Sequence, residues 1–139
     1  MKARIKWVDG VSFVGESGSG HTMVMDGAPE GGGRDLGMRP METVLIGTGG
    51  CSAYDVVHIL KKSRAAISDC VLEIDSERAA DDPKVFTRIH LHFIVSGKNL
   101  KPQQVERAIQ LSAEKYCSAS IMLAKTAAIT HDFEIRDTA

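Results

Sequence analysis

Hydrophobic and polar positions alternate in three short runs at the start of the chain, residues 2–8, 11–15 and 21–25. Alternation with a period of two predicts β-strands, and Asp9-Gly10 between the first two runs is a hairpin signal. The glycine-rich residues 28–37 predict a flexible loop. Because the 27 residues before this loop are too few to fold alone, we expect a single domain over residues 1–139.

From Pro40 to about residue 64 the apolar positions recur with helical spacing instead. Proline suits the first turn of a helix, and the basic residues Lys61 and Lys62 suit its end. The pattern allows one long helix, or two helices that meet at Gly49-Gly50. All residues from Gly47 to Ala53 are small, which allows another backbone to approach closely, so this stretch predicts a tight helix crossing.

The second half of the chain combines both patterns. Residues 70–78 and 85–95 alternate on either side of a turn at 81–83, residues 102–117 and 118–125 have helical spacing, and residues 129–135 alternate again. The predicted order is therefore βββ-α-ββ-αα-β, an α+β fold. Because a three-stranded N-terminal sheet would leave a face and an edge uncovered, we expect a second copy of the chain to cover them in a homodimer.

Charge and composition exclude several classes of partner. The net charge is −1, from 17 basic and 18 acidic residues, and 5% of residues are aromatic, so neither charge nor base stacking favours nucleic acid. The apolar stretches are interrupted before the roughly 20 residues that a membrane span needs. The first residues lack the apolar core of a secretory signal. We therefore expect a cytoplasmic protein without a membrane partner.

The chain has three cysteines, and in a reducing compartment a cysteine is either a small buried hydrophobe or a reactive thiol. Cys51 and Cys117 both lie among small residues, and each is followed by a serine. If they meet in space, one thiol can attack an oxidant and the other can resolve the product. Cys70 lies on the apolar face of a predicted strand, where packing is the expected role.

Local spacing indicates no metal site and no cofactor, because the chain has neither Cys-x-x-Cys nor His-x₃-His. His90 and His92 lie on one face of a predicted strand, opposite its apolar positions. Such a pair can bind a metal, but the sequence offers no apparent third ligand. We therefore interpret this face as solvated or as part of an interface.

Three motifs accompany this order of elements: Arg39-Pro40-Met41-Glu42, Gly49-Gly50-Cys51-Ser52-Ala53, and the run from Leu111 to Ser118 that ends in Glu-Lys-Tyr-Cys-Ser. Pro40 also precedes Cys51 by eleven residues. Together they resemble the OsmC/Ohr superfamily, and within it the YhfA-like branch, over nearly the whole chain. The resemblance implies an intertwined homodimer in which sheets wrap two long central helices, with a site at the dimer interface.

The resemblance also implies thiol-dependent peroxidase chemistry. Cys51 would attack the outer oxygen of an organic hydroperoxide, and Cys117 would resolve the resulting sulfenic acid as a disulfide. A dithiol, such as a dihydrolipoyl group, would then restore both thiols. The apolar residues expected to line a pocket for the hydroperoxide are Leu45, Val56, Met122 and Leu123.

Peroxidases of the superfamily use a glutamate directly after the helix-starting proline and an arginine from the N-terminal region. Here Met41 follows the proline and Glu42 comes one residue later. One residue along a helix turns a side chain by about 100°, so Glu42 points in a different direction from the glutamate of the family pattern. Arg34 is the first candidate for the arginine and Arg39 the second, although the spacing of Arg34 to the proline differs from the family pattern.

Two other hypotheses remain open: a non-catalytic dimer that senses oxidants or binds a ligand, and a structural protein with buried, inert thiols. A peroxidatic Cys51 needs a nearby cation or a helix N-terminus, because a free thiol is only a few per cent ionised at neutral pH. In an unbroken helix Cys51 lies about 16 Å from the start, where the helix dipole has faded. A break at Gly49-Gly50 would place it at a new helix N-terminus instead.

Overall fold

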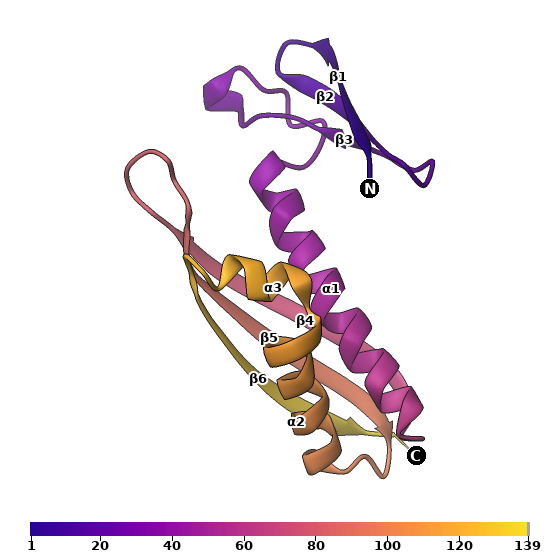
Figure 1. Ribbon diagram of the computed structural model, residues 1–139. Coiled ribbons are helices and arrows are strands. Elements are labelled where there is room, and N and C mark those ends of the chain that lie inside the picture. Colours follow the sequence, from indigo (N-terminus) through magenta and orange to yellow (C-terminus); the bar gives the residue numbers. More distant parts are fainter. Residues whose placement is uncertain (139) are drawn as a thin grey trace. The chain divides into compact units, whose positions relative to one another are not determined.

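The computed structural model describes residues 1–138, which form two compact units, one from Met1 to Ile46 and one from Gly47 onward. Figure 1 traces them along the chain. The predicted order βββ-α-ββ-αα-β is confirmed, with a short 3₁₀ turn at Pro29–Gly31 and a π-helix as additions. The elements are β1 Ala3–Asp9, β2 Ser12–Ser17, β3 Thr22–Met25, α1 Pro40–Lys62, β4 Ala66–Arg78, β5 Phe86–Lys98, α2 Pro102–Leu111, the π-helix Ser112–Tyr116, α3 Ser118–Leu123 and β6 Ala128–Asp137.

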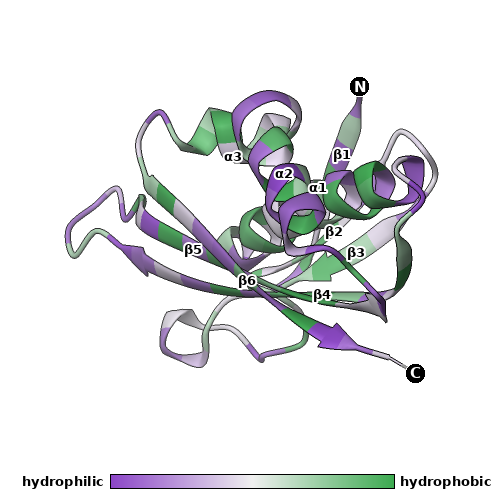
Figure 2. Ribbon diagram, turned by 90° about the horizontal axis from the view of Figure 1, so that it is seen from below, coloured by the Kyte–Doolittle hydropathy of each residue, from purple (hydrophilic) through white to green (hydrophobic). Residues whose placement is uncertain are grey.

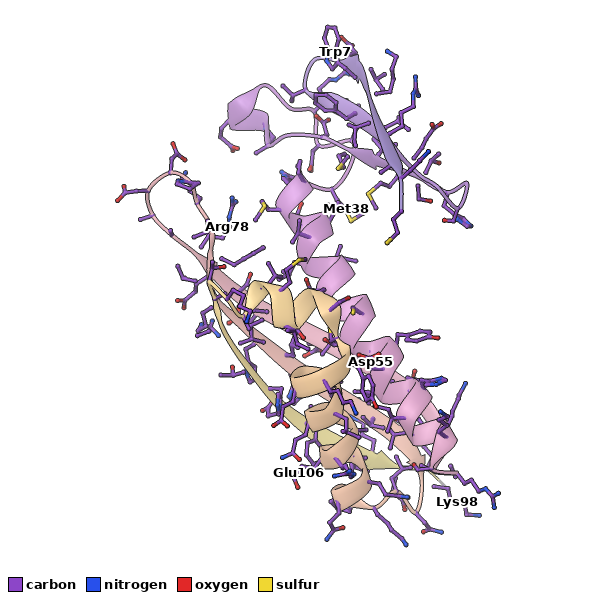
Figure 3. The ribbon with its side chains drawn as sticks, in the orientation of Figure 1. Trp7, Met38, Asp55, Arg78, Lys98 and Glu106 are labelled. Atoms are coloured by element: carbon purple, nitrogen blue, oxygen red, sulfur yellow. The ribbon has the colours of Figure 1, made fainter. Side chains whose placement is uncertain are left out.

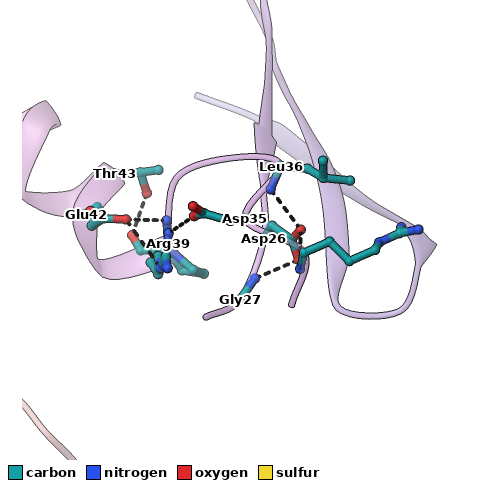
Figure 4. A network of polar contacts seen from close by, with 9 residues as sticks. Asp26, Gly27, Asp35, Leu36, Arg39, Glu42 and Thr43 are labelled. Carbon is teal, nitrogen blue, oxygen red and sulfur yellow. Dashed lines mark hydrogen bonds and ion pairs between the residues drawn. The ribbon is translucent and has the colours of Figure 1, made fainter. Parts of the chain in front are cut away.

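The first unit contains an antiparallel sheet in the order β1-β2-β3, whose first two strands form the hairpin predicted at Asp9-Gly10. Every residue of β1 is exposed, including the large apolar side chains of Ile5 and Trp7. After β3, the carboxylate of Asp26 is 2% exposed and organises the following loop. It accepts hydrogen bonds from the backbone N–H groups of Gly27, Arg34 and Leu36 (Figure 4).

Helix α1 runs without a break from Pro40 to Lys62, which decides between the two arrangements left open by Gly49-Gly50. At its start, Glu42 accepts a hydrogen bond from the backbone N–H of Arg39 at 2.8 Å and so satisfies a free helix donor. On length and apolar composition alone, α1 could cross a membrane. Because Val56 and Leu60 are fully buried in the second unit, we interpret α1 as a core helix.

The second unit is a three-stranded sheet with helices on one face. Strands β4 and β5 form an antiparallel hairpin, and β6 pairs with β5 in parallel after the helical crossover through α2 and α3. Figures 1 and 2 show the helices of this unit on the same side of the sheet. The buried core consists mainly of Ile89, Leu91, Phe93 and Val95 from β5, Val105, Ala108 and Ile109 from α2, and Val56 and Leu60 from α1.

At Gly49, the small residues of α1 allow the sheet to approach closely. A Cβ atom at Gly49 would lie 2.5 Å from Cδ1 of Ile74, so α1 packs directly on the side chains of β4 at this point. Three residues later, the hydroxyl of Ser52 lies 3.2 Å from the sulfur of Cys117. Gly49 is thus in contact with the sheet, while the helix crossing expected over Gly47–Ala53 stays a prediction for the other side of α1.

Candidate redox site

The sulfur atoms of Cys51 and Cys117 lie close together in the second unit. Both sulfurs and a carboxylate oxygen of Asp55 are all within 4.8 Å of one another. Cys51 is half-buried on α1, whereas the side chain of Cys117 is fully buried at the junction between the π-helix and α3. Residues that are 66 positions apart in the sequence therefore form one site, as the two-thiol hypothesis requires.

The π-helix sets the position of Cys117. Its last hydrogen bond runs from the backbone N–H of Cys117 to the carbonyl of Ser112, five residues earlier, at 2.8 Å. Cys117 then takes an extended conformation and becomes the N-cap of α3, where its sulfur accepts the backbone N–H of Ser120 at 3.4 Å. The hydroxyl of Ser112 donates to Asp55 at 3.0 Å and ties the π-helix to α1. Figure 3 shows Asp55 on the side of α1 that faces this segment.

Hydrogen bonds favour a thiolate at Cys117. Burial by itself raises the pKa of this thiol, but hydrogen bonds from Ser120 and from the hydroxyl of Ser52 outweigh burial and lower the pKa below its ordinary value. A sulfur at a helix N-cap accepts a backbone N–H in the same way as an oxygen cap does. The cysteine at a helix N-terminus is therefore Cys117, and Cys51 lies within an unbroken helix.

The environment of Cys51 acts in the opposite direction. Burial raises the pKa of this thiol, and the interaction with Cys117 raises it further, while the backbone N–H of Ala119 and the hydroxyl of Ser118, 4.0 Å away, offset only part of the effect. The two thiols therefore shift in opposite directions, and they titrate as a coupled pair.

A cavity of about 130 Å³ lies between the helices and the sheet beside this pair. Its lining includes Ser52 and Ser120, which contact the sulfur of Cys117, and Ser112, which contacts Asp55. Apolar side chains of α2, β5 and β6 complete the lining. The expected lining residues do not contribute to it. Val56 is fully buried in the core and Met122 is 68% exposed, and their place in a pocket for the hydroperoxide stays a prediction.

The family of the chain follows from comparison with known proteins. The sequence model of the family described as OsmC-like protein matches residues 31–132. The chain is also 52% identical over 135 residues to Protein YhfA of Escherichia coli strain K12, with 97% of this chain and 98% of YhfA covered. The chain belongs to the OsmC-like family. The resemblance derived from the motifs around Pro40, Cys51 and Cys117 is thereby confirmed.

Solved structures share this OsmC-like architecture. A hypothetical protein from Aquifex aeolicus VF5 superimposes with a TM-score of 0.87 at 25% identity, over 99% of this chain and 97% of that one. The organic hydroperoxide resistance protein OhrB of Bacillus subtilis superimposes with a TM-score of 0.63 at 19% identity, over 96% and 98% of the two chains. At this low identity, the likeness to OhrB shows the common fold.

The candidate activating residues of the OsmC-like chain make ion pairs within the first unit. The guanidinium of Arg34 lies 3.2 Å from a carboxylate oxygen of Asp9. Arg39 pairs with Asp35, and Glu42 caps α1 through the backbone N–H of Arg39 (Figure 4). These contacts explain how the loop before α1 is held, and the catalytic roles of Arg34 and Glu42 remain predictions.

Sequence reasoning missed Asp55 and the serines around the thiols. Asp55 follows Cys51 by four residues, one turn of α1, so the two side chains share a face of the helix. That spacing was a usable signal. Ser52 and Ser112 carried none, because their importance depends on the packing of the π-helix against α1.

The histidine pair on β5 has a shared partner that the sequence did not reveal. Parallel pairing places Asp132 of β6 beside His92, and one oxygen of Asp132 lies 2.9 Å from His90 and 2.7 Å from His92. The hydrogen bond with Asp132 raises the pKa of His92 above its ordinary value. One oxygen of Asp132 thus joins the two histidines on a partly exposed face of the sheet.

Proposed function

We propose that this chain is a thiol-dependent peroxidase that reduces organic hydroperoxides through Cys51 and Cys117. The observation that carries the proposal is the convergence of the two sulfurs, within 4.8 Å of each other, in a chain of the OsmC-like family. OhrB, which shares the fold, is named as an organic hydroperoxide resistance protein. A pair of thiols at this separation needs only a small side-chain movement to form a disulfide.

Accessibility supports the proposed roles of the two cysteines. Cys51 is half-buried and can be reached by a hydroperoxide, whereas Cys117 is fully buried. In the attack, the Cys51 sulfur bonds to the outer oxygen, the O–O bond breaks, and the Cys117 thiolate accepts the proton that Cys51 loses. The leaving alkoxide takes up a proton and departs as an alcohol. The lowered pKa of Cys117 raises the fraction of this thiol that is ionised and can accept the proton.

In the second step, Cys117 resolves the sulfenic acid of Cys51 as a disulfide. Cys117 attacks the sulfenic sulfur of Cys51, the S–S bond forms, and the hydroxyl leaves as water after protonation. Two thiols and one hydroperoxide thereby yield one disulfide, one alcohol and one water. An external dithiol then reduces the disulfide by thiol–disulfide exchange and is itself oxidised to a disulfide.

A redox-sensing dimer is the second candidate function, and two observations favour it. Burial raises the pKa of Cys51, and the carboxylate of Asp55 lies within 4.8 Å of both sulfurs. Both features slow the formation of a thiolate at Cys51. A sensor would form the same disulfide in a stoichiometric reaction, without rapid turnover.

The working protein in this proposal is a cytoplasmic homodimer of one OsmC-like domain per chain. Large apolar side chains exposed in the first unit support a partner copy; they are Ile5, Trp7, Val8, Met23, Val24 and Leu36. Exposed apolar surface of this kind is typical of an interaction surface. In this assembly Arg34 is the proposed source of positive charge for Cys51, and Glu42 supports the start of α1.

The deciding experiment mixes fully reduced, chelator-treated protein with one equivalent of cumene hydroperoxide and follows peroxide loss, intact mass and peptide maps. We expect rapid loss of two hydrogens per chain and a Cys51–Cys117 link. With an excess of dithiol, peroxide should be consumed over many turnovers. Cys51→Ser should abolish consumption, whereas Cys117→Ser should leave a sulfenic acid at Cys51 that a dimedone-type reagent traps.

Cys70→Ser is the matched control, because Cys70 is a half-buried thiol on β4 that the site does not use. It should behave as the wild type. A stoichiometric disulfide that forms slowly and does not turn over would replace the peroxidase proposal with the sensor. If neither peroxide nor a small alkylating agent reacts with Cys51 or Cys117, the thiols are structural and both proposals fail.

A further inference from the structure

Asp55 is the part of the site that peroxide chemistry leaves without a role. Its carboxylate is half-buried, and one of its oxygens lies within 4.8 Å of both sulfurs. A negative charge at this position does nothing to stabilise a neighbouring thiolate. One oxygen, Oδ2, accepts the hydroxyl of Ser112 at 3.0 Å, which fixes the orientation of the carboxylate. Two thiols and an oriented carboxylate that converge on one point are instead a set of metal ligands.

We propose that the reduced forms of Cys51 and Cys117, together with Asp55, bind a zinc-class divalent cation, and that oxidation of the two thiols to a disulfide releases it. The proposal that the cation binds rests on the ligand geometry alone. The proposal that the cation regulates the thiols rests on the proposed peroxidase function. While bound, the cation occupies both sulfurs and holds the pair in its reduced form.

The separations fit a tetrahedral ion after a small adjustment. Zinc lies about 2.3 Å from thiolate sulfur and about 2.0–2.2 Å from carboxylate oxygen, which places tetrahedral ligand atoms roughly 3.6–3.8 Å apart. The three atoms here are at most 4.8 Å apart, so each pair needs to close by about 1.2 Å or less. A change of this size lies within ordinary side-chain rotation on α1 and at the start of α3.

The three ligands accept hydrogen bonds from neighbouring groups, as the ligands of metal sites do. Hydrogen bonds from Ser112 to Asp55, and from Ser120 and Ser52 to the sulfur of Cys117, orient the ligands from outside. Thiolate sulfur selects zinc and copper(I) over magnesium and calcium. Three protein ligands leave a fourth position open for water or for an external ligand, and partial exposure of Cys51 provides a route of entry.

The release of the cation by oxidation needs no reactant beyond the hydroperoxide and two protons. The metal-bound pair holds two thiolates, and one hydroperoxide and two protons convert them into a disulfide, an alcohol and water. The disulfide retains no thiolate, so the cation is left with the carboxylate alone and dissociates. Each equivalent of hydroperoxide should therefore free one equivalent of zinc.

Metal binding can be tested without any peroxide. The full-length chain, reduced and stripped of metal under anaerobic conditions, is titrated with Co²⁺ and then with Zn²⁺. We expect one ion per chain, with a sulfur-to-cobalt charge-transfer band that Zn²⁺ abolishes. Asp55→Asn should weaken zinc binding by at least about tenfold, and Ser112→Ala by about tenfold as the loss of an outer partner. Cys70→Ser and excess Mg²⁺ should leave the titration unchanged.

The outcomes separate this proposal from the proposed function. If the reduced wild type gives no sulfur-to-cobalt band, or if Asp55→Asn binds zinc as tightly as the wild type does, the metal site is overturned, whatever the peroxidase assay shows. If zinc binds as expected but the metal-free protein consumes no hydroperoxide, the site stands and the peroxidase fails. Zinc that remains bound after the Cys51–Cys117 disulfide has formed would overturn the release step.

Discussion

At the scale of single residues, the chemistry of the thiol pair depends on a few short polar contacts. The hydroxyl of Ser52 lies 3.2 Å from the sulfur of Cys117, and both groups are buried. A hydrogen bond to an ionised group in such a place contributes roughly 1.5–3 kcal/mol. With Ser120, this hydroxyl is therefore one of the hydrogen-bond partners that lower the pKa of Cys117.

Replacing that hydroxyl should therefore move the titration of Cys117. In a chain that also carries Cys51→Ser and Cys70→Ser, so that one thiol remains, Ser52→Ala should raise the pKa of Cys117. The sign is upward because the lost hydrogen bond favoured the charged form. Thiolate absorbance followed against pH measures the midpoint.

Ser118→Ala in the same background is the control, because the hydroxyl of Ser118 lies near the sulfur of Cys51 and does not contact that of Cys117. It should leave the midpoint in place. An equal midpoint in Ser52→Ala and its parent would show that the backbone N–H of Ser120 stabilises the thiolate without help from Ser52.

At the scale of elements, the helices and strands followed from the periodicity of the sequence, and the π-helix did not. Residues 102–117 have a continuous helical spacing, and nothing in it marks the change of hydrogen-bond pattern at Ser112. The change matters because it turns Cys117 toward α1 and frees it to cap α3. The contact between Cys51 and Cys117 is tertiary, so residue spacing could suggest it only through the family resemblance.

The packing of α1 on β4 offers a test at the same scale. Alanine at Gly49 places its Cβ against Cδ1 of Ile74, an overpacking that costs about 1–3 kcal/mol, while the helix gains roughly 0.5–1 kcal/mol from the loss of glycine. Gly49→Ala should therefore destabilise the wild type by about 1 kcal/mol. Ile74→Val removes Cδ1, so in that background Gly49→Ala should become stabilising.

Urea unfolding of the four proteins in this double-mutant cycle gives the coupling energy, for which we expect about 1 kcal/mol or more. The other side-chain atoms near the added Cβ, on Leu72 and Ile74, lie at 3.5 Å or beyond, which is ordinary contact. Additive effects of the two substitutions would mean that α1 moves away from the sheet instead of pressing on Ile74.

At the scale of the whole molecule, α1 has two faces of different character. Thr48, Ser52, Val56 and Leu60 are buried on one face, with the spacing of successive helical turns. On the other side, Ile46 is 56% exposed and Tyr54 is 70% exposed, and a Cβ at Gly50 would meet no described atom within 4 Å. A helix with one buried face and an exposed apolar stripe suits packing against the same helix of a second copy.

The homodimer is testable through this stripe. The wild-type chain of 15.0 kDa should sediment at twice that mass. Gly50→Arg should shift it to the monomer, because a long charged side chain would have to be buried where two helices meet closely. Glu106→Arg, at an exposed position of α2, is the matched control and should leave the dimer intact (Figure 3). A Gly50→Arg protein that still sediments as the wild type does would place the contact between copies elsewhere, with the exposed apolar side chains of the first unit as the next surface to test.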